Sequence, residues 1–279
     1  MTQTSAQPVV RSLAVSGATL HYEVRGNGPV VAVIGSPMTA SEFAAVADAL
    51  AVDHTVVTYD PRGLGASPIE DPAQDSTPEL RADDVAAILD DLGAGPADVF
   101  GSSGGAVTGL ALAARYPGLV RTLVAHEPPL LELLPASEAA KQRAATRDII
   151  DTFHSDGPGA AMAKFMATAG FDQSDGDAPA PPGPPPASAE MARQLADLSR
   201  FFSHELLCTT TYVPDLDALR ASRVIVGIGA DSEPLITHGT SLALCRLLGV
   251  EPVIFPGDHG GFMSAPGEFA DALRAVLSN

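Results

Sequence analysis

Apolar runs alternate with helix-forming segments along the first half of the chain. The runs are short and mostly β-branched, and they span Val30–Ile34, Thr55–Tyr59, Asp98–Gly101 and Arg121–Ala125. Runs of this kind are typical of strands that are buried on both faces of a parallel sheet. Ahead of them, Arg11–Ser16 and Leu20–Arg25 flank Gly17, which predicts an antiparallel pair of strands.

Helix signals occupy the segments between these strands. Serine, threonine and proline favour the first turn of a helix, and glycine favours its end. The helices expected here cover Glu42–Leu50 with Ser41 as N-cap, Pro78–Leu92 with Ser76 or Thr77 as N-cap, and Gly104–Tyr116. This alternation predicts an α/β protein with a doubly wound, mostly parallel sheet and right-handed crossovers.

The alternation is interrupted between Pro128 and about Ser222. Only helical patterns occur there, over Ser137–Phe153, Pro158–Ala169 and Ser188–Leu207, and the proline-rich stretch Asp177–Pro186 is expected to be an extended loop. The alternation then resumes, with strands at Val224–Ile228 and Pro252–Phe255 and helices at His238–Leu248 and Gly267–Leu277. We expect one eight-stranded core from residues 1–127 and 223–279, with residues 128–222 as a helical insertion between strands 6 and 7.

Composition narrows the class of partner. The 279 residues include 34 acidic and 16 basic ones, which gives a formal net charge of −18. A charge of that sign repels phosphate backbones and anionic lipids, so a small-molecule substrate is expected rather than a nucleic acid or a membrane. The N-terminus lacks the features of a secretory signal, which favours the cytoplasm. The histidines show no metal-ligand spacing such as HExxH, so neither a metal nor another cofactor is expected.

A candidate nucleophile lies where a strand turns directly into a helix. The stretch Gly101-Ser102-Ser103-Gly104-Gly105 fits G-x-S-x-G. A serine on so tight a turn has strained backbone angles, and flanking glycines avoid the Cβ clashes that would forbid the turn. The N-terminus of the helix supplies N–H donors for a developing oxyanion. We expect Ser103 to be the nucleophile, because Ser102 lies one residue too early for glycines at both flanks.

A nucleophilic serine needs a base, and the base needs a third group to orient it. The base is expected after the last strand, where His259 lies in the glycine-rich stretch Pro256–Phe262. His126 and His204 could also face the pocket, but neither lies on a glycine-rich loop after the last strand.

The orienting acid is expected at the carboxyl end of an earlier strand. Asp231 follows the strand Val224–Ile228 and is the first choice. Glu127 directly follows the strand Arg121–Ala125 and is the alternative acid, while Glu233 is a weaker candidate.

Two further stretches fit this arrangement. Ser36 follows the strand Val30–Ile34, and its backbone N–H would be an oxyanion donor beside that of Gly104. The stretch Asp60–Ser67 follows the next strand, and its polar residues and glycines are expected to stabilise a loop.

Taken together, these motifs resemble the α/β-hydrolase family from about Arg11 to the C-terminus. The resemblance rests on the turn at Ser103, on D-x-R-G-x-G-x-S at Asp60–Ser67 and on the order Ser103, Asp231, His259. It implies that residues 128–222 form a cap domain over the site. Seven apolar or aromatic residues of that cap are then candidates to line an apolar substrate pocket, with Met166, Phe202, His204 and Tyr212 as first choices and Met162, Phe165 and Phe201 beside them.

The chain departs from the family pattern in two places. Ile34 stands where the family usually has a histidine before the oxyanion glycine. The acid of the family commonly lies three residues after the glycine that ends its strand, and counting from Gly229 gives Ser232, with Asp231 one residue short. Glu127 therefore stays open as the acid.

The expected activity is hydrolysis of an ester or lactone of a small, largely apolar substrate, through an acyl-enzyme on Ser103. Two alternatives remain at this point. A carbon–carbon bond hydrolase can use the same triad, and a non-hydrolytic tailoring or ligand-binding protein can use the same fold.

Overall fold

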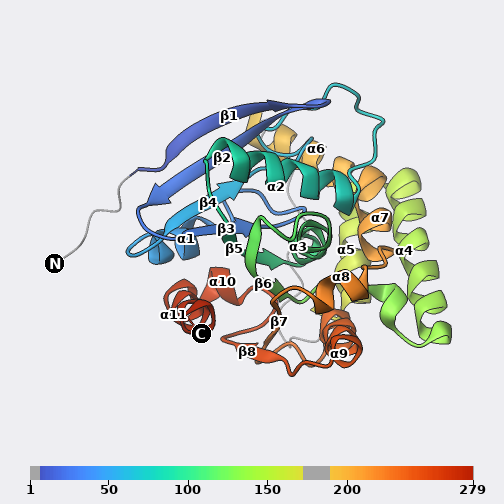
Figure 1. The fold of residues 1–279 in the computed structure, drawn as a ribbon. Helices are drawn as coiled ribbons and strands as arrows, with labels where there is room; N and C mark the ends of the chain where they lie inside the picture. The colour runs from blue at the N-terminus through green and yellow to red at the C-terminus, as the bar shows by residue number, and fades with distance from the viewer. Residues whose placement is uncertain (1–6, 172–188, 279) are drawn as a thin grey trace.

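Eight strands form one sheet in the computed structural model, which describes residues 7–171 and 189–278. The strands are β1 (Val9–Val15), β2 (Ala18–Gly26), β3 (Val30–Ile34), β4 (Thr55–Tyr59), β5 (Ala97–Ser102), β6 (Val120–His126), β7 (Val224–Gly229) and β8 (Val253–Phe255). Their order is β1-β2-β4-β3-β5-β6-β7-β8 (Figure 1). Strand β2 pairs antiparallel with β1 and β4, and every other pair is parallel. The predicted fold class is confirmed.

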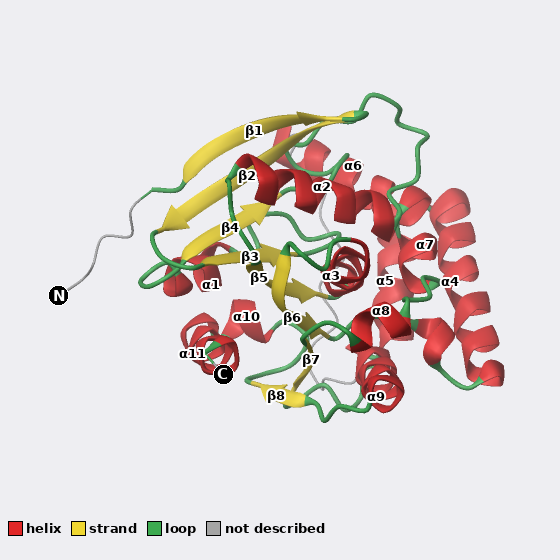
Figure 2. Cartoon of the chain, viewed as in Figure 1, coloured by secondary structure: helices red, strands yellow, loops and turns green. Residues whose placement is uncertain are grey.

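Helices cover both faces of this sheet, as Figure 2 shows. Those outside the insertion are α1 (Ala44–Leu50), α2 (Pro78–Asp91), α3 (Gly104–Arg115), α9 (Ile236–Leu248), α10 (Gly261–Ser264) and α11 (Pro266–Leu277). Alternate residues of β3 point to opposite faces, because successive side chains of a strand do. Ala32 and Ile34 join the core under α2 and α3, while Val31 and Val33 join the core under α1 and α11. Burial on both faces explains the unbroken apolar runs.

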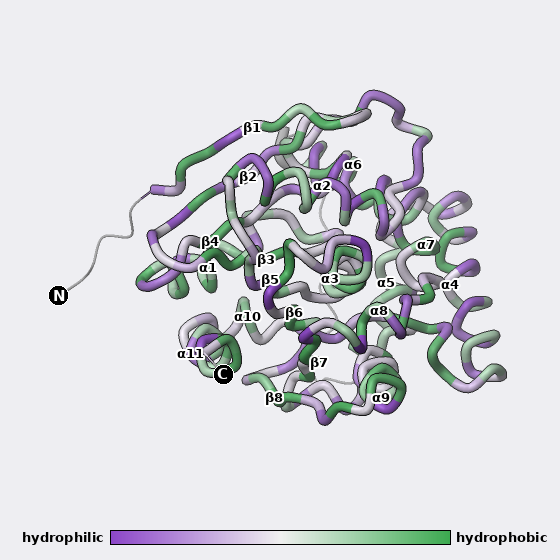
Figure 3. The backbone as a smooth tube through the Cα atoms, viewed as in Figure 1, coloured by the Kyte–Doolittle hydropathy of each residue, from purple (hydrophilic) through white to green (hydrophobic). Residues whose placement is uncertain are grey.

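Among the described residues, the insertion between β6 and β7 contains helices joined by loops and no strand. It contains the 3-10 helix η1 (Leu131–Leu133), α4 (Ala136–Asp156), α5 (Pro158–Ala169), α6 (Ala189–His204), α7 (Leu206–Thr210) and α8 (Leu216–Arg220). Helices α4, α5 and α7 lie beside one end of the sheet (Figure 1). In Figure 3 the strand β7 is almost wholly apolar, whereas hydrophobic and hydrophilic residues alternate along α4. This pattern is typical of a helix with one packed face.

Several predicted helix boundaries are wrong. The first helix begins at Ala44, and the Ser41 hydroxyl donates to Glu42 instead of capping it. The helix expected over Ser188–Leu207 is broken at Glu205 into α6 and α7. Thr77 is the N-cap of α2 as predicted, accepting from the Leu80 N–H at 3.3 Å. The short helices α8 and α10 were not predicted.

Two sequence-based expectations concern other parts of the chain. The proline-rich stretch Asp177–Pro186 lies outside the described residues. Across residues 7–171 and 189–278, no helix combines the length and the apolar character needed to cross a membrane.

Candidate active site

Ser103 lies at the sharp turn between β5 and α3. Its backbone angles are φ 55° and ψ −123°, a strained conformation for a residue with a Cβ. The turn brings the strand and the helix very close together. A Cβ on Gly101 would lie 2.5 Å from the carbonyl oxygen of Gly105, and a Cβ on Gly105 would lie 2.2 Å from that of Ile34. Glycine at both positions therefore makes the turn possible.

The two serines of this turn lie in different environments. The Ser102 side chain is fully buried, and its Oγ lies 3.2 Å from Nδ1 of His126. Ser103 is half-buried, and it lines a cavity. Only Ser103 of this pair is therefore placed to meet a substrate.

His259 lies on the loop after β8 and lines the same cavity as Ser103. Its Nδ1 lies 2.5 Å from Oε2 of Glu127, the residue that follows β6. The Glu127 carboxylate is fully buried, and it also accepts from the Gly229 N–H at 2.8 Å and from the Thr237 hydroxyl at 3.0 Å. Glu127 is thus held firmly against the imidazole.

The surroundings of Glu127 favour its charged form. Burial raises the pKa of Glu127. The hydrogen bond from His259, together with the electrostatic effect of His259 and His126, outweighs burial and lowers this pKa to about 2. The neighbouring His126 is fully buried, and burial lowers its pKa to about 4. At neutral pH, Glu127 is therefore ionised and His126 is neutral.

This geometry corrects the choice of acid. Asp231 is exposed, and within the described part of the chain its carboxylate forms no hydrogen bond or ion pair. Its backbone N–H donates to the Gly257 carbonyl instead, which holds the loop after β7 against the loop after β8. Ser232, where the family spacing places an acid, is fully buried. The acid beside His259 is Glu127, the alternative, and neither Asp231 nor Glu233 takes part in that contact.

Backbone strain occurs at Ser103 and at Glu127. Among the non-glycine residues that the structure describes, Ser103 and Glu127 alone have a positive φ, at 55° and 51°. Such conformations cost about 1–3 kcal/mol each and persist where the surrounding structure imposes them. They occur here at the ends of two adjacent parallel strands, β5 and β6.

Ser36 and Gly104, the expected oxyanion donors, both border the cavity beside Ser103. Gly104 is the first residue of α3, so its N–H has no acceptor within the helix. A Cβ on Gly104 would lie 2.6 Å from the Ser36 carbonyl oxygen, which shows how closely the two segments approach.

The cavity has a volume of about 300 Å³ and extends from Ser103 into the insertion. Its walls are almost entirely apolar. The contributing side chains of the insertion include Leu131, Ile149, Met162, Phe165, Met166, Ala169, Phe201 and Leu206. Most of these residues lie on helices, at the spacing that helix residues packed in a hydrophobic core also have. The sequence alone therefore cannot distinguish cavity-lining residues from core residues.

Four of the seven predicted pocket residues line the cavity, namely Met162, Phe165, Met166 and Phe201, but of the four first choices only Met166 does. Phe202 is fully buried within the apolar cluster of the insertion. His204 turns away, with Nδ1 2.9 Å from the Asp75 carboxylate. Tyr212 packs against the core under α2 and α3. In residues 7–171 and 189–278, no cluster of three or more His, Cys, Asp or Glu side chains is arranged to hold a metal ion.

Comparisons with known proteins agree with this fold. A family model described as "alpha/beta hydrolase fold" matches residues 28–174. The "Uncharacterized hydrolase YraK" of Bacillus subtilis (strain 168) is 31% identical over 274 aligned positions, and the match covers 95% of each chain.

Solved structures with the same fold include two enzymes. A thermophilic esterase from Thermogutta terrifontis superposes with a TM-score of 0.71 at 22% identity, over 98% of both chains. The enol-lactonase from Burkholderia xenovorans LB400 superposes with a TM-score of 0.67 at 20% identity, over 96% of this chain and 100% of that one.

The family model covers more than half of the chain, and the similarity to YraK extends over nearly the whole length of both proteins. The chain therefore belongs to the α/β-hydrolase family. It is a hydrolase of that family.

Proposed function

We propose that this protein hydrolyses a carboxylic ester or lactone with a small, largely apolar acyl part, through an acyl-enzyme on Ser103. One observation carries the proposal. Ser103 and His259 border a single apolar cavity, and the imidazole of His259 is fixed by the ionised Glu127. In this role, residues 128–222 act as a cap domain that covers the substrate.

The contact with Glu127 supports one tautomer of His259. Because Nδ1 donates to the carboxylate, Nε2 carries the lone pair and acts as the base. Nε2 takes the Ser103 proton while Oγ bonds to the substrate carbonyl carbon. The Glu127 charge stabilises the imidazolium that forms.

The carbonyl oxygen then becomes an oxyanion, which accepts hydrogen bonds from the backbone N–H groups of Ser36 and Gly104. When the tetrahedral intermediate collapses, the bond to the alcohol oxygen breaks and the imidazolium protonates that oxygen. Water, deprotonated by His259, attacks the acyl-enzyme, and a second collapse releases the acid and restores the Ser103 hydroxyl.

The cavity favours a hydrocarbon over a polar acyl group. Three threonines on its wall already donate their hydroxyl protons within the protein. Thr146 donates to the Gln142 carbonyl, Thr210 to the Leu206 carbonyl and Thr237 to the Glu127 carboxylate. A polar acyl group would lose its water there without gaining those donors.

The size of the cavity bounds the acyl chain. A volume of about 300 Å³ holds roughly ten groups the size of a water molecule. Each buried methylene contributes about 0.8 kcal/mol, or about fourfold in kcat/KM. The values of kcat/KM for p-nitrophenyl esters should therefore rise from acetate to hexanoate or octanoate and then level off.

The test combines this ester series, a lactone panel and labelling by a fluorophosphonate probe. S103A should lower kcat at least about 10⁴-fold and abolish labelling. S102A is the matched control, because the Ser102 hydroxyl is buried against His126. This variant should keep both the turnover and the labelling of wild type. Ester or lactone turnover by S103A would overturn the proposal, as would a wild-type protein that hydrolyses neither class.

A further inference from the structure

A buried ion pair lies beside the oxyanion hole and outside the catalytic residues proposed so far. Arg81, on α2, and Glu205, between α6 and α7, are both fully buried, with Nη1 of Arg81 3.4 Å from Oε2 of Glu205. Buried ion pairs are poor sources of stability, because desolvation offsets much of their attraction. The other hydrogen bonds of Arg81 and Glu205 therefore indicate what this pair does.

Glu205 reaches the first oxyanion residue. Its Oε2 accepts a hydrogen bond from the Ser36 hydroxyl at 2.8 Å, and both side chains are buried. Ser36 and Glu205 lie in different parts of the fold, the end of β3 and the helical insertion. The contact thus fixes the residue whose backbone N–H faces the substrate carbonyl.

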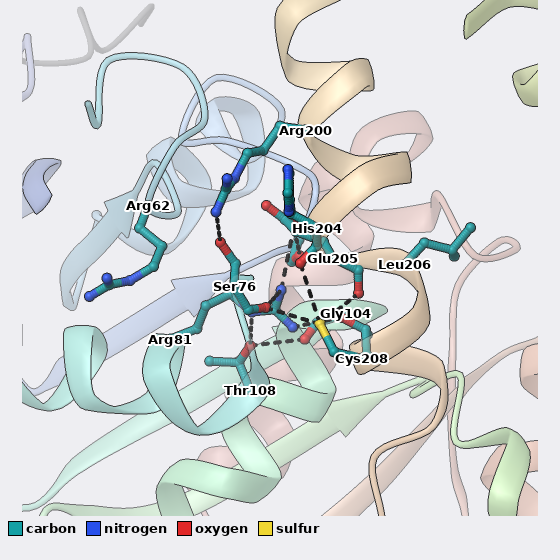
Figure 4. A network of polar contacts seen from close by, with 12 residues as sticks. Arg62, Ser76, Arg81, Gly104, Thr108, Arg200, His204, Glu205, Leu206 and Cys208 are labelled. Carbon is teal, nitrogen blue, oxygen red and sulfur yellow. Dashed lines mark hydrogen bonds and ion pairs between the residues drawn. The ribbon is translucent and has the colours of Figure 1, made fainter. Parts of the chain in front are cut away.

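Arg81 reaches the second oxyanion residue through one intermediate. Its Nε donates to the Thr108 hydroxyl at 3.1 Å, and that hydroxyl donates to the Gly104 carbonyl at 3.0 Å. Figure 4 shows Arg81 between Glu205 and Thr108, with Gly104 beyond. One connected network therefore holds Ser36 and Gly104 at the same time.

The helices of the insertion are interrupted at the residue that joins this network. Helix α6 ends at His204, Glu205 has φ −127°, and α7 begins at Leu206. The Glu205 carboxylate at this interruption is buried, and its Oε1 has no hydrogen-bond partner among the described atoms. A buried carboxylate oxygen without a partner is costly. The contact with Ser36 gives this costly placement a functional reason.

We infer that Glu205 is a positioning residue for the oxyanion hole, which it aligns by accepting the hydrogen bond from Ser36 with Arg81 as its counter-ion. The inference rests on the proposed function. Through Glu205, docking of the helical insertion sets the position of the Ser36 N–H.

Three variants separate positioning from general packing. E205L removes the acceptor at similar volume and should lower kcat about 10- to 100-fold, with KM changed less than about twofold, because a displaced donor weakens transition-state binding. E205Q should restore kcat to within about threefold, since its amide oxygen can still accept from Ser36 and its NH₂ group takes the position of the unpartnered Oε1. S36A keeps the backbone N–H and should lower kcat as E205L does.

The double variant S36A/E205L should be no slower than either single variant, because each removes the same contact. A boronic acid inhibitor, which mimics the tetrahedral intermediate, should lose affinity in parallel with kcat. The affinity of a substrate-like amide should stay the same.

A second buried pair provides the matched control. Arg62 and Asp84 are both buried, with Nε of Arg62 2.7 Å from Oδ2 of Asp84, and neither lines the cavity. D84N should lower the melting temperature but keep kcat within about twofold. If E205L matches wild type in kcat, or if D84N slows turnover as much as E205L, the inference is wrong. A wild-type protein without ester or lactone turnover would overturn the proposed function, and the inference with it.

Discussion

Ser103 and Glu127 share a backbone conformation that side chains rarely adopt. Ser103 lies where β5 ends, and Glu127 directly follows β6, the neighbouring strand. With a positive φ, each side chain points in a different direction from the side chains of the strand before it. For Ser103 the result is a hydroxyl at the cavity, and for Glu127 it is a carboxylate beneath His259. Strain at both positions is what a preorganised site is expected to contain.

Exchanging each candidate acid for its amide tests the role of Glu127. E127Q keeps the shape but removes the charge that stabilises the imidazolium, so kcat should fall about 10³- to 10⁴-fold. D231N should stay within about twofold of wild type, because Asp231 is exposed. Initial rates with p-nitrophenyl butyrate measure both. A slow D231N beside an active E127Q would restore the first choice of acid.

The residues of the site were predictable to different degrees. Ser103 and His259 follow from local motifs, since glycines mark each turn. The acid does not, because Glu127 and Asp231 both follow buried strands and the choice depends on side-chain directions in space. The position of Asp231 after the strand Val224–Ile228 favoured it, although the family spacing gives Ser232, and the positive φ at Glu127 leaves no mark in the sequence.

At the scale of elements, the strands were predicted well because burial on both faces requires unbroken apolar runs. The break between α6 and α7 was not predictable. The sequence around Glu205 is compatible with a continuous helix, and the hydrogen-bond partner of its carboxylate, Ser36, lies 169 positions away. Long-range contacts of this kind override local propensity.

Helix α6 is docked onto the core by another arginine. Arg200 donates from Nη1 to the Pro72 carbonyl at 2.9 Å, and from Nη2 to the Gln74 carbonyl and to the Ser76 hydroxyl. Figure 4 shows the last of these contacts, from a helix of the insertion to the segment ahead of α2. Hydrogen bonds to a charged group stabilise by about 1.5–3 kcal/mol each.

R200M leaves these three acceptors without their donor. Desolvation of the buried guanidinium offsets part of the sum, so R200M should lower the free energy of unfolding by about 3 kcal/mol. R193M, on the exposed side of the same helix, should change it by less than about 0.5 kcal/mol. Urea unfolding followed by far-ultraviolet circular dichroism measures both. Equal effects of the two substitutions would contradict the docking role of Arg200.

At the scale of the whole molecule, two opposing responses to acid compete. The net charge of −18 repels itself, and protonation of surface carboxylates relieves that repulsion as the pH falls. Salt at 0.15 M screens exposed charges beyond about 8 Å, so the gain is small under those conditions. Buried groups are screened much less, and they should therefore dominate the pH dependence of stability.

His126 is the group that should act first. Burial lowers its pKa from 6.5 to about 4, so the unfolded chain binds a proton that the folded chain refuses. Stability is then lost as the pH falls from 6.5 toward 4, by about 2 kcal/mol between pH 7 and pH 5. Glu127, with a pKa lowered from 4.5 to about 2, holds its contribution down to about pH 4.5 and loses it only below that. Glu127 therefore contributes little to the change between pH 7 and pH 5. Burial raises the pKa values of Glu205, Asp84 and Asp197, which acts in the opposite direction, so the contribution of His126 is measured as a difference between variants.

Urea unfolding of wild type, H126N and H154N at pH 7 and pH 5, in 0.15 M salt, measures this contribution. H126N lacks the titrating imidazole, so its stability should fall by about 2 kcal/mol less than that of wild type over the interval, whatever its stability at pH 7. H154N replaces an exposed histidine of α4 and should follow wild type. A fall in H126N as steep as in wild type would show that other groups cause the loss. The comparison uses slopes because removing a buried ring also leaves a cavity, which lowers stability equally at both pH values.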